Sequence, residues 1–309
     1  MATAWFTHPA CLRHEMGPGH PERPARLIAI ADAFAAAGLA DRLLPREAPA
    51  ADDARLKRVH DAAYLAAIAA MAPAAGLVAL DPDTAINPHS LTAARHAAGA
   101  VVAAVDGVLA GEFANAFCAV RPPGHHACRD RAMGFCLFNN VAVAAAHALT
   151  VHGLGRVAIV DFDVHHGNGT EDIFHDEPRV LLASSFQHPF YPFSGADSGN
   201  AHIVPMPLPA GTDGRGFRQA WETVGLPALA DFAPELILIS AGFDAHRDDP
   251  LAGLLLTEED FAWLTREVLA IAQTCCGGRV VSTLEGGYDL AALGRSAVAH
   301  VQELASAVS

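Results

Sequence analysis

The stretch VAIVDFDVHHGN, residues 157–168, decides the fold class of this chain. It opens with a short apolar run rich in β-branched residues and passes directly into acids and histidines. Runs of the same kind recur at 116–120, 180–183, 236–239 and 280–283, with longer helix-like stretches between them. Strands that alternate with helical segments are typical of βαβ units, so the sequence predicts a three-layer αβα fold around a mainly parallel sheet.

Capping residues predict where several of the helices begin and end. The expected helices run from Ser90 toward Gly111, from Asn139 to near Gly153, and from Thr257 to about Cys275. No internal repeat, linker or shift in composition divides the chain. Residues 1–309 are therefore predicted to form a single domain.

Composition narrows the classes of function. The chain has 309 residues, 52% of them apolar, and a formal net charge of −14. Nucleic-acid-binding domains are typically basic, so this charge argues against a nucleic-acid partner. A negative field instead attracts cationic partners such as amines.

The sequence predicts a cytoplasmic location. The first residues lack the basic and apolar regions of a signal peptide, and no uninterrupted apolar run of about 18 residues predicts a membrane span. The cysteines form neither a C-x-x-C pair nor a dense disulfide framework, which fits reduced thiols. We expect no membrane partner, and a homo-oligomer is compatible with the sequence.

Polar segments that directly follow the apolar runs carry the functional signal. They are RPPGHH (121–126), DFDVHHGN (161–168), SAGFD (240–244) and LEGGY (284–288). In open α/β sheets, ligands bind outside the carboxyl ends of the strands. We therefore expect these segments to face one crevice.

Two of these segments contain candidate metal ligands. Asp163 and His165 are two residues apart, so on an extended segment their side chains share one face with Asp161. Asp244 adds a carboxylate from another strand end. Two carboxylates and one imidazole are typical of catalytic zinc, which keeps three protein ligands and one open position. Solvated loop acids and a core histidine are the alternative reading of the same residues.

His125, His126 and Tyr288 are candidates for moving protons and stabilising charge. Histidine titrates near neutral pH and is the common general acid or base. Tyr288 follows two glycines, where the backbone can turn sharply, and its phenol can donate to a developing oxyanion. Taken singly, a structural histidine pair and a packing tyrosine are the alternatives, but the combination is more specific than its parts.

Motifs along nearly the whole chain resemble the histone deacetylase and acetylpolyamine amidohydrolase family, in the family's order. They are GHPER (19–23), RPPGHH (121–126), GFCLFNN (134–140), DFDVHHGNGT (161–170), SAGFD (240–244) and LEGGY (284–288). With Asn168, the chain resembles the class II branch of the family, since class I relatives carry Asp at this position. The resemblance implies an arginase/deacetylase-like fold and zinc-dependent hydrolysis of an N-acyl amide.

The resemblance also implies two kinds of metal site. One zinc ion per chain would bind Asp163, His165 and Asp244. A structural K⁺ or Na⁺ ion would bind backbone oxygens in the region of Asp161, Asp163, His165, Ser184 and Ser185.

The catalytic roles are implied in the same way. Asp161 is expected to pair with His125, and Asn168 to orient His126. His126 then corresponds to the general base and acid, while His125 acts mainly electrostatically. Tyr288 corresponds to the tyrosine that polarises the carbonyl.

A narrow acyl-lysine tunnel and an exit for acetate are further implications of the resemblance. Phe135 and Tyr191 match positions that wall the tunnel, and Gly134 matches its floor. The remaining expected tunnel residues are Leu251, Gly286 and Gly287. Arg23 corresponds to an arginine that lines the exit region.

Three positions bear on substrate choice. Phe193 stands where relatives have glycine near the tunnel rim, and Phe186 where many have histidine. Polyamine-specific members carry Glu seven residues after the aspartate that matches Asp244, where this chain has Leu251. We therefore expect acyl-lysine in proteins or peptides as the substrate, with an acetylpolyamine or another acetylated small amine as the alternative.

Two further alternatives differ in mechanism. An arginase-like binuclear manganese hydrolase needs more carboxylates to bridge its metals, but Asp244 is followed by Ala-His without a second acid two residues on. An inactive acyl-lysine binder would be expected to lack Tyr288, a zinc ligand or one of the paired histidines, and all are present. The chain also has no G-x-S-x-G motif, so a serine nucleophile is not indicated.

Overall fold

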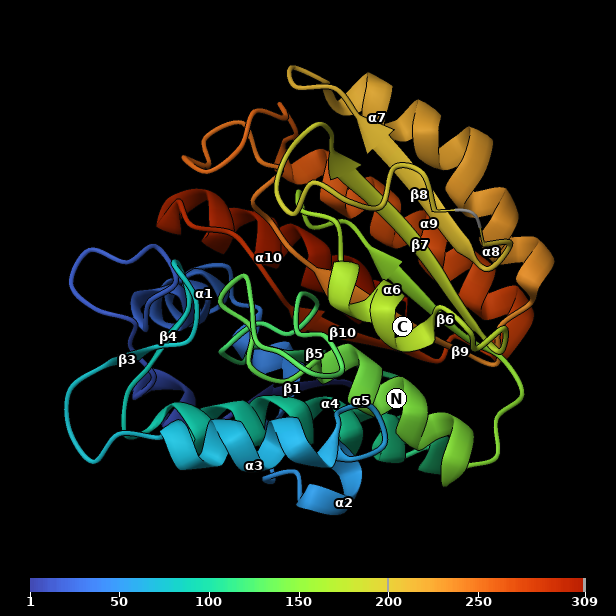
Figure 1. The fold of residues 1–309 in the computed structure, drawn as a ribbon. Coiled ribbons are helices and arrows are strands. Elements are labelled where there is room, and N and C mark those ends of the chain that lie inside the picture. The colour runs from blue at the N-terminus through green and yellow to red at the C-terminus, as the bar shows by residue number, and fades with distance from the viewer. Residues whose placement is uncertain (199, 308–309) are drawn as a thin grey trace.

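The computed structural model describes residues 1–198 and 200–307, and in these residues eight strands form one parallel sheet (Figure 1). Their order across the sheet is β2-β1-β5-β10-β9-β6-β7-β8. The strands are β1 (Thr3–Thr7), β2 (Leu43–Glu47), β5 (Asn115–Cys118), β6 (Val157–Asp161), β7 (Val180–Gln187), β8 (Ile203–Leu208), β9 (Leu236–Ala241) and β10 (Val280–Leu284). A short antiparallel pair, β3 (Val78–Ala79) and β4 (Ala85–Ile86), lies apart from this sheet.

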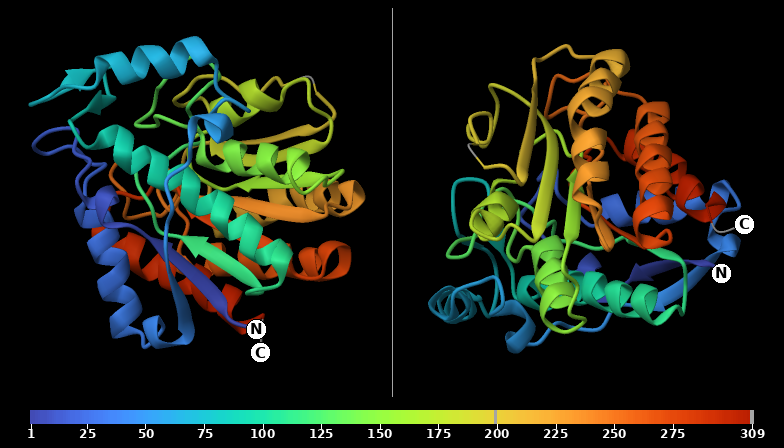
Figure 2. Two further views of the ribbon diagram at one scale, coloured as in Figure 1. Left: turned by 90° about the horizontal axis from the view of Figure 1, so that it is seen from below. Right: turned by 90° about the vertical axis from the view of Figure 1, so that its right-hand side faces the viewer.

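Helices cover both faces of the sheet, which confirms the predicted αβα fold. One face packs against α4 (Ser90–Ala110) and α5 (Asn140–Thr150), which cross in front of the strands in the left view of Figure 2. The other side carries α1 (Ala25–Ala36), α8 (Leu226–Phe232), α9 (Glu258–Cys276) and α10 (Leu290–Ser306). Shorter helical segments are Pro9–Leu12, Ala40–Arg42, α2 (Asp53–Leu56), α3 (Ala62–Met71), α6 (Asn168–Phe174), α7 (Gly214–Ala220) and the π-helical turn Trp221–Gly225.

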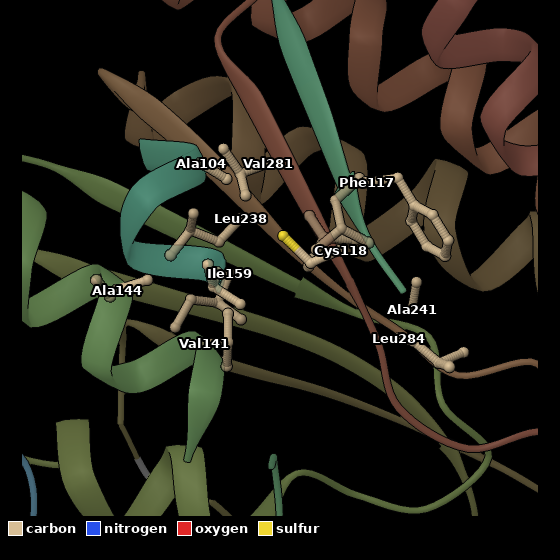
Figure 3. Close-up of a cluster of buried hydrophobic side chains, with 14 of the residues drawn as sticks. Ala104, Phe117, Cys118, Val141, Ala144, Ile159, Leu238, Ala241, Val281 and Leu284 are labelled. Atoms are coloured by element: carbon tan, nitrogen blue, oxygen red, sulfur yellow. The ribbon is translucent and has the colours of Figure 1, made fainter. Parts of the chain in front are cut away.

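The core lies between the central strands and the two helical layers. Every residue of β6, β9 and β10 is buried, as expected for parallel strands covered on both faces. Val141 of α5 packs in one apolar cluster with Ile159 of β6 and Leu238 of β9 (Figure 3). Full burial of each such side chain contributes about 1.5–3 kcal/mol. The apolar runs that the sequence predicts as strands are therefore strands because both of their faces are apolar.

Three strands of the sheet were not predicted, and two of them are its edges. β2 contains Pro45, and β8 contains Pro205 and Pro207. Proline lacks a backbone N–H and is tolerated at sheet edges but weakens a strand pattern. β1 is a short polar-flanked segment whose pairing with β2 and β5 depends on distant residues. Local pattern alone therefore indicates the centre of the sheet better than its borders.

The helix ends agree with the capping predictions except at the start of α4 and the end of α5. Asn139 caps α5 by accepting from the N–H of Ala142 at 3.0 Å, and Thr257 begins α9 in a capping box. Gly111, with φ of 72°, ends α4 as predicted. Ser90 is the first helical residue of α4 and not its cap, because its hydroxyl accepts from the N–H of Asn87 outside the helix. α5 ends at Thr150, three residues before the expected glycine.

Helix α4 is long and apolar enough to cross a membrane when judged by length and composition alone. In the fold, 67% of its most apolar window is buried. Gly99 lies where α4 contacts the preceding loop, and an added Cβ there would be 1.9 Å from the carbonyl oxygen of Pro49. The apolar residues of α4 thus pack against the sheet and the neighbouring segments.

Glu22 forms a buried ion cluster that joins the N-terminal segment to the loop after β5. Its carboxylate accepts from Arg26 at 3.0 Å and from Nη2 of Arg121 at 2.6 Å, and all three side chains are fully buried. Arg121 also donates to the carbonyl oxygens of Cys11 and His14. Burial alone would raise the pKa of Glu22, but the guanidinium groups outweigh it and lower the pKa to about 2.

Glu22→Gln should lower the free energy of unfolding by about 3–5 kcal/mol, because it leaves two buried guanidinium groups without their counter-charge. Chemical denaturation near neutral pH measures this loss. The folded pKa of Glu22 is depressed, so its contribution is present above its ordinary pKa of 4.5 and is lost as the pH falls toward 2. Asp53→Asn, which removes an exposed ion pair with Arg95, is the control and should have a much smaller effect. Equal losses for both variants would contradict the importance of the cluster.

Candidate active site

Four adjacent strands carry the polar segments that the sequence singles out. β5, β10, β9 and β6 are consecutive neighbours in the sheet, and all run in the same direction. The carboxyl ends of these four strands therefore lie together at one end of the sheet, which we call its carboxyl edge. The segments that follow these ends are 121–126, 284–288, 240–244 and 161–168. These segments converge because strands distant in sequence are paired in the middle of the sheet.

Asp163, His165 and Asp244 bring one ligand atom each to within 4.8 Å of one another. His165 Nδ1 lies 3.1 Å from Asp163 Oδ1 and 3.2 Å from Asp244 Oδ2. Asp244 Oδ2 is buried and has no hydrogen-bond partner among the residues that the structure describes. A buried carboxylate oxygen without a donor requires a compensating cation. The donor set therefore fits a zinc ion held by two carboxylates and one imidazole.

Backbone N–H groups orient both carboxylates. Asp163 accepts from the N–H groups of His165 at 2.9 Å and Gly286 at 2.8 Å, and Asp244 accepts from that of Val164 at 2.9 Å. Gly286 allows this close approach, because an added Cβ there would lie 2.1 Å from Asp244 Oδ2. Position 286 in the loop after β10 thus has to be glycine, because Asp163 and Asp244 lie so close to it.

Electrostatics also favour a cation between these three side chains. Burial disfavours charge on His165, but the nearby carboxylates of Asp163 and Asp244 outweigh it and raise the pKa of His165 to about 10. Burial and the neighbouring Asp163 raise the pKa of Asp244. A metal ion bound here would be stabilised by the same two carboxylates and would displace the proton from His165.

A second cluster of metal-ligand type lies between α4 and the end of α5, away from the sheet edge. The Nε2 atoms of His147 and His152 lie 2.6 and 2.7 Å from Asp106 Oδ1. Arg58 Nη1 lies 3.0 Å from the other ring nitrogen of His147. Arginine only donates, so that nitrogen accepts and Nε2 carries the proton toward Asp106. These groups satisfy one another, and we interpret them as a hydrogen-bonded cluster.

His126 is held as a neutral ring. Its Nδ1 lies 2.7 Å from Asn168 Oδ1, while Asn168 Nδ2 faces the sulfur atoms of Cys128 and Met133. This arrangement makes Nδ1 the donor and leaves Nε2 free to accept a proton. Burial and then the charge of His125 lower the pKa of His126 well below its ordinary value. A neutral imidazole with a fixed tautomer is suited to act as a base near neutral pH.

His125 is held in the opposite charge state. Its Nδ1 lies 2.9 Å from Asp161 Oδ2, and its backbone N–H donates to Glu285 at 3.2 Å. Burial would lower the pKa of His125, but the carboxylates of Asp161 and Asp163 outweigh it and raise the pKa well above its ordinary value. The two adjacent histidines therefore differ in charge because one faces a carboxylate and the other an amide.

Tyr288 lies at the same edge, in the loop after β10. Burial and the nearby Asp244 raise the pKa of its phenol well above its ordinary value, so the group stays protonated. Arg26 stacks on the ring, with its guanidinium carbon 4.9 Å from the ring centre, and its Nε donates to the carbonyl oxygen of Gly287 at 2.7 Å. Arg26 carries no local sequence signal of this role, since its ion-pair partner Glu22 lies outside α1.

Arg23, expected at an acetate exit, is exposed and lines a surface cavity of about 310 Å³ formed by residues 15–20 and 22–25. The structure does not bring it to Tyr288. Arg26, one helical turn further along the chain, is the arginine that contacts the tyrosine loop. Arg23, the last residue of GHPER, and Arg26 are three residues apart, and they differ in burial.

Aromatic residues expected in the tunnel surround the histidines and the tyrosine. The ring of Tyr191 lies edge-on to His126 at 5.3 Å and to His165 at 6.0 Å, and Phe135 lies edge-on to Tyr288 at 5.9 Å. Gly134 has φ of 56°, and an added Cβ would lie 2.4 Å from the ring of His126. A side chain at position 134 would therefore displace the proposed base.

Residues of the expected rim are more accessible than this centre. Leu251 is half-buried, and Phe193 is 76% exposed with φ of 61°. Phe186 is instead buried, with its ring 4.6 Å from that of His166. Of the positions that differ from relatives, Phe193 and Leu251 can therefore meet a large substrate, whereas Phe186 belongs to the interior.

The residues expected around a monovalent cation lie on two paired strands and the loop that follows. Asp161 of β6 is the register partner of Ser184 of β7. The hydroxyl of Ser184 lies 3.2 Å from His166 Nδ1, and that of Ser185 accepts from the indole N–H of Trp221 at 3.1 Å. The hydroxyls of both serines are therefore engaged by other side chains of the fold.

Comparisons with known proteins agree with the fold and the site. The pattern of the histone deacetylase domain matches residues 20–304. A histone deacetylase-like amidohydrolase of Pseudomonas aeruginosa is 40% identical over 98% of this chain and 86% of the relative. Polyamine deacetylase HDAC10 of Homo sapiens is 41% identical over 92% of this chain and 44% of that protein.

A solved structure shows the same relationship. The crystal structure of the HDA15 HD domain matches with a TM-score of 0.93 and 37% identity, covering 99% of this chain and 90% of that one. The fold and the site define an enzyme of the deacetylase and amidohydrolase class. The chain belongs to the histone deacetylase family.

The activity should persist to acidic pH, because the lowered pKa of His126 keeps the base neutral below its ordinary pKa of 6.5. The acid limb of a kcat/KM profile is therefore expected below that pH. Asn168→Asp keeps the shape but places a carboxylate on Nδ1, which should move the limb upward by about one to three units. Profiles of both proteins at constant metal content test this. An unmoved limb in Asn168→Asp would show that His126 does not govern it.

Proposed function

We propose that this chain hydrolyses an N-acyl amide with one zinc ion bound to Asp163, His165 and Asp244. The observation that carries the proposal is the convergence of these donors, one of them an unpartnered oxygen among the described residues, beside a neutral histidine and a protonated tyrosine. Zinc at this position would supply a Lewis acid that polarises the amide carbonyl and acidifies a water molecule. Membership of the histone deacetylase family supports this assignment.

His126 is the proposed proton carrier. Its Nε2 accepts a proton from the attacking water and returns it to the leaving amine, while Asn168 keeps Nδ1 protonated. His125 stays charged through Asp161 and stabilises negative charge that develops beside it. This division follows from the opposite pKa shifts of the two rings, since a group that is already protonated cannot act as the base.

Tyr288 is the proposed donor to the tetrahedral oxyanion. Its phenol stays protonated at working pH, and the loop that carries it is held by Arg26. Loss of one such preorganised donor typically costs about 10²–10³ in rate. Phe135 and Tyr191 lie beside these groups and limit the approach to a narrow, apolar acyl chain.

Acyl-lysine in a peptide or protein is the proposed substrate. Leu251 is half-buried at the expected rim and offers apolar contact to a lysine stem or to flanking peptide. An acetylpolyamine is the second candidate. It is favoured by the net charge of −14 and by the similarity to a relative named polyamine deacetylase HDAC10.

Three further properties are proposed for this chain. Backbone oxygens near Asp161 and Ser184 would hold a structural K⁺ or Na⁺ ion, since these residues face each other on paired strands. The whole chain would work as one domain, because one sheet carries the residues of the site. A cytoplasmic location is proposed as well, and the free cysteines, among them buried Cys118 and Cys136, support it.

Turnover should require one divalent metal per chain. Chelation is expected to abolish activity, one equivalent of zinc to restore it, and Asp244→Ala to lower kcat/KM by at least about a hundredfold, since it removes a ligand. Asp106→Ala is the matched control and should keep zinc content and rate. Metal analysis with kinetics tests both. Full turnover without metal would contradict the mechanism, and two metals bound at the site would favour a binuclear hydrolase.

Leu251→Glu should shift preference toward acetylpolyamines about tenfold, or about 1.4 kcal/mol, because a carboxylate at the rim attracts the distal ammonium group. Leu251→Gln, which has similar size without charge, is the control and should leave the ratio nearly unchanged. The measurement is kcat/KM for an acetyl-lysine peptide and for acetylspermidine on all three proteins. Wild-type preference for acetylspermidine would overturn the substrate assignment. An unmoved ratio in Leu251→Glu would show that this position does not select substrate.

A further inference from the structure

Asp249 links the loop after β9 to the loop that carries Tyr288. It lies five residues after Asp244, and its side chain is almost fully buried. One carboxylate oxygen, Oδ2, accepts from the N–H of Tyr288 at 2.6 Å and from that of Asp289 at 3.2 Å. The other, Oδ1, accepts from the N–H of Leu251 at 3.0 Å. One buried carboxylate therefore joins the tyrosine loop to the expected rim of the site.

The peptide unit between Gly287 and Tyr288 is held from both sides. Its carbonyl oxygen accepts from Arg26 Nε at 2.7 Å, and its N–H donates to Asp249 at 2.6 Å. Gly287 has φ of 117°, a conformation that residues with side chains rarely adopt. Two charged side chains from α1 and the β9 loop thus fix the plane of a peptide in an unusual conformation, and that plane sets the direction in which Tyr288 leaves the backbone.

A carboxylate is required at position 249 by the number of donors around it. Its two oxygens receive three backbone N–H groups, and an amide would present its own N–H₂ group to one side. This acceptor is kept at a cost, because burial and the neighbouring Asp244 raise the pKa of Asp249 to about 7. The three backbone N–H groups counteract this rise and favour the carboxylate form.

We propose that Asp249 is a positioning residue that acts through Tyr288. This proposal rests on the proposed role of Tyr288 as oxyanion donor. Asp249 holds the 287–288 peptide so that the phenol meets the developing oxyanion, and it has no contact of its own with the reacting atoms. Loss of the carboxylate frees the N–H of Tyr288 and lets the ring move. The contact of the phenol matters chiefly in the transition state, where the oxyanion develops, so kcat should fall more than KM rises.

A double-mutant cycle separates this role from a structural one. Asp249→Asn is measured in the wild-type and in the Tyr288→Phe backgrounds, with one acetyl-lysine peptide and zinc-loaded protein. In the wild type, kcat should fall about 10- to 100-fold, since displacement of a catalytic group by about 1 Å has such effects. In the Tyr288→Phe background, the further loss should be less than about twofold, because coupled residues are not additive.

The controls make each outcome decisive. Asp260→Asn removes another buried carboxylate, one that accepts a backbone N–H at the start of α9, and should lower thermal stability while its fold-loss in kcat is small in both backgrounds. If Asp249→Asn does not fold, Asp249→Glu keeps the charge with a longer stem and enters the same cycle. Equal losses from the Asp249 variant in both backgrounds overturn the positioning role. Wild-type kcat in Tyr288→Phe alone instead overturns the proposed function of the tyrosine.

Discussion

Compensation of buried carboxylates is the constraint on which the rest of this structure depends. A parallel sheet directs all its carboxyl ends to one edge, and here that edge collects Asp161, Asp163, Asp244, Asp249 and Glu285 in the interior. An unpaired buried charge costs several kcal/mol, so each acid needs donors or a counter-charge. Most are satisfied by backbone N–H groups or by histidine. The oxygen left over on Asp244, with no partner among the described residues, lies where a metal ion would complete the balance.

The sequence predicts the centre of this arrangement well because the signal there is local. An apolar run followed at once by Asp163 and His165 reports both a buried strand and the polar groups at its end. Partners that stabilise the site from a distance carry no such local signal. Glu22 meets Arg121 across about a hundred residues of sequence, and Asp249 meets Tyr288 across the β9–β10 connection. Only the pairing of strands, which local pattern does not determine, brings these groups together.

Chemistry and substrate choice are carried by parts of the fold with different exposure. The groups proposed for proton transfer are buried, and their pKa values depend on neighbours that the fold holds in place, as Asn168 does for His126. Leu251 and Phe193, the accessible positions expected at the rim, lie in loops. A change in the interior disturbs several hydrogen bonds, whereas a change at the rim alters mainly what approaches. Residue patterns therefore indicate the type of reaction more firmly than they indicate the substrate.

Asp249 connects the buried groups proposed for the chemistry to the accessible loop that carries Leu251. It binds the backbone N–H of Leu251, not its side chain, and the backbone N–H of Tyr288. Any residue except proline at position 251 presents the same N–H, so the anchor of the tyrosine loop survives a change of rim side chain. Substrate preference at that position can thus change in charge or size while the geometry of the oxyanion donor is conserved. The same backbone anchor explains why a single carboxylate, placed between rim and centre, can limit the rate without selecting the substrate.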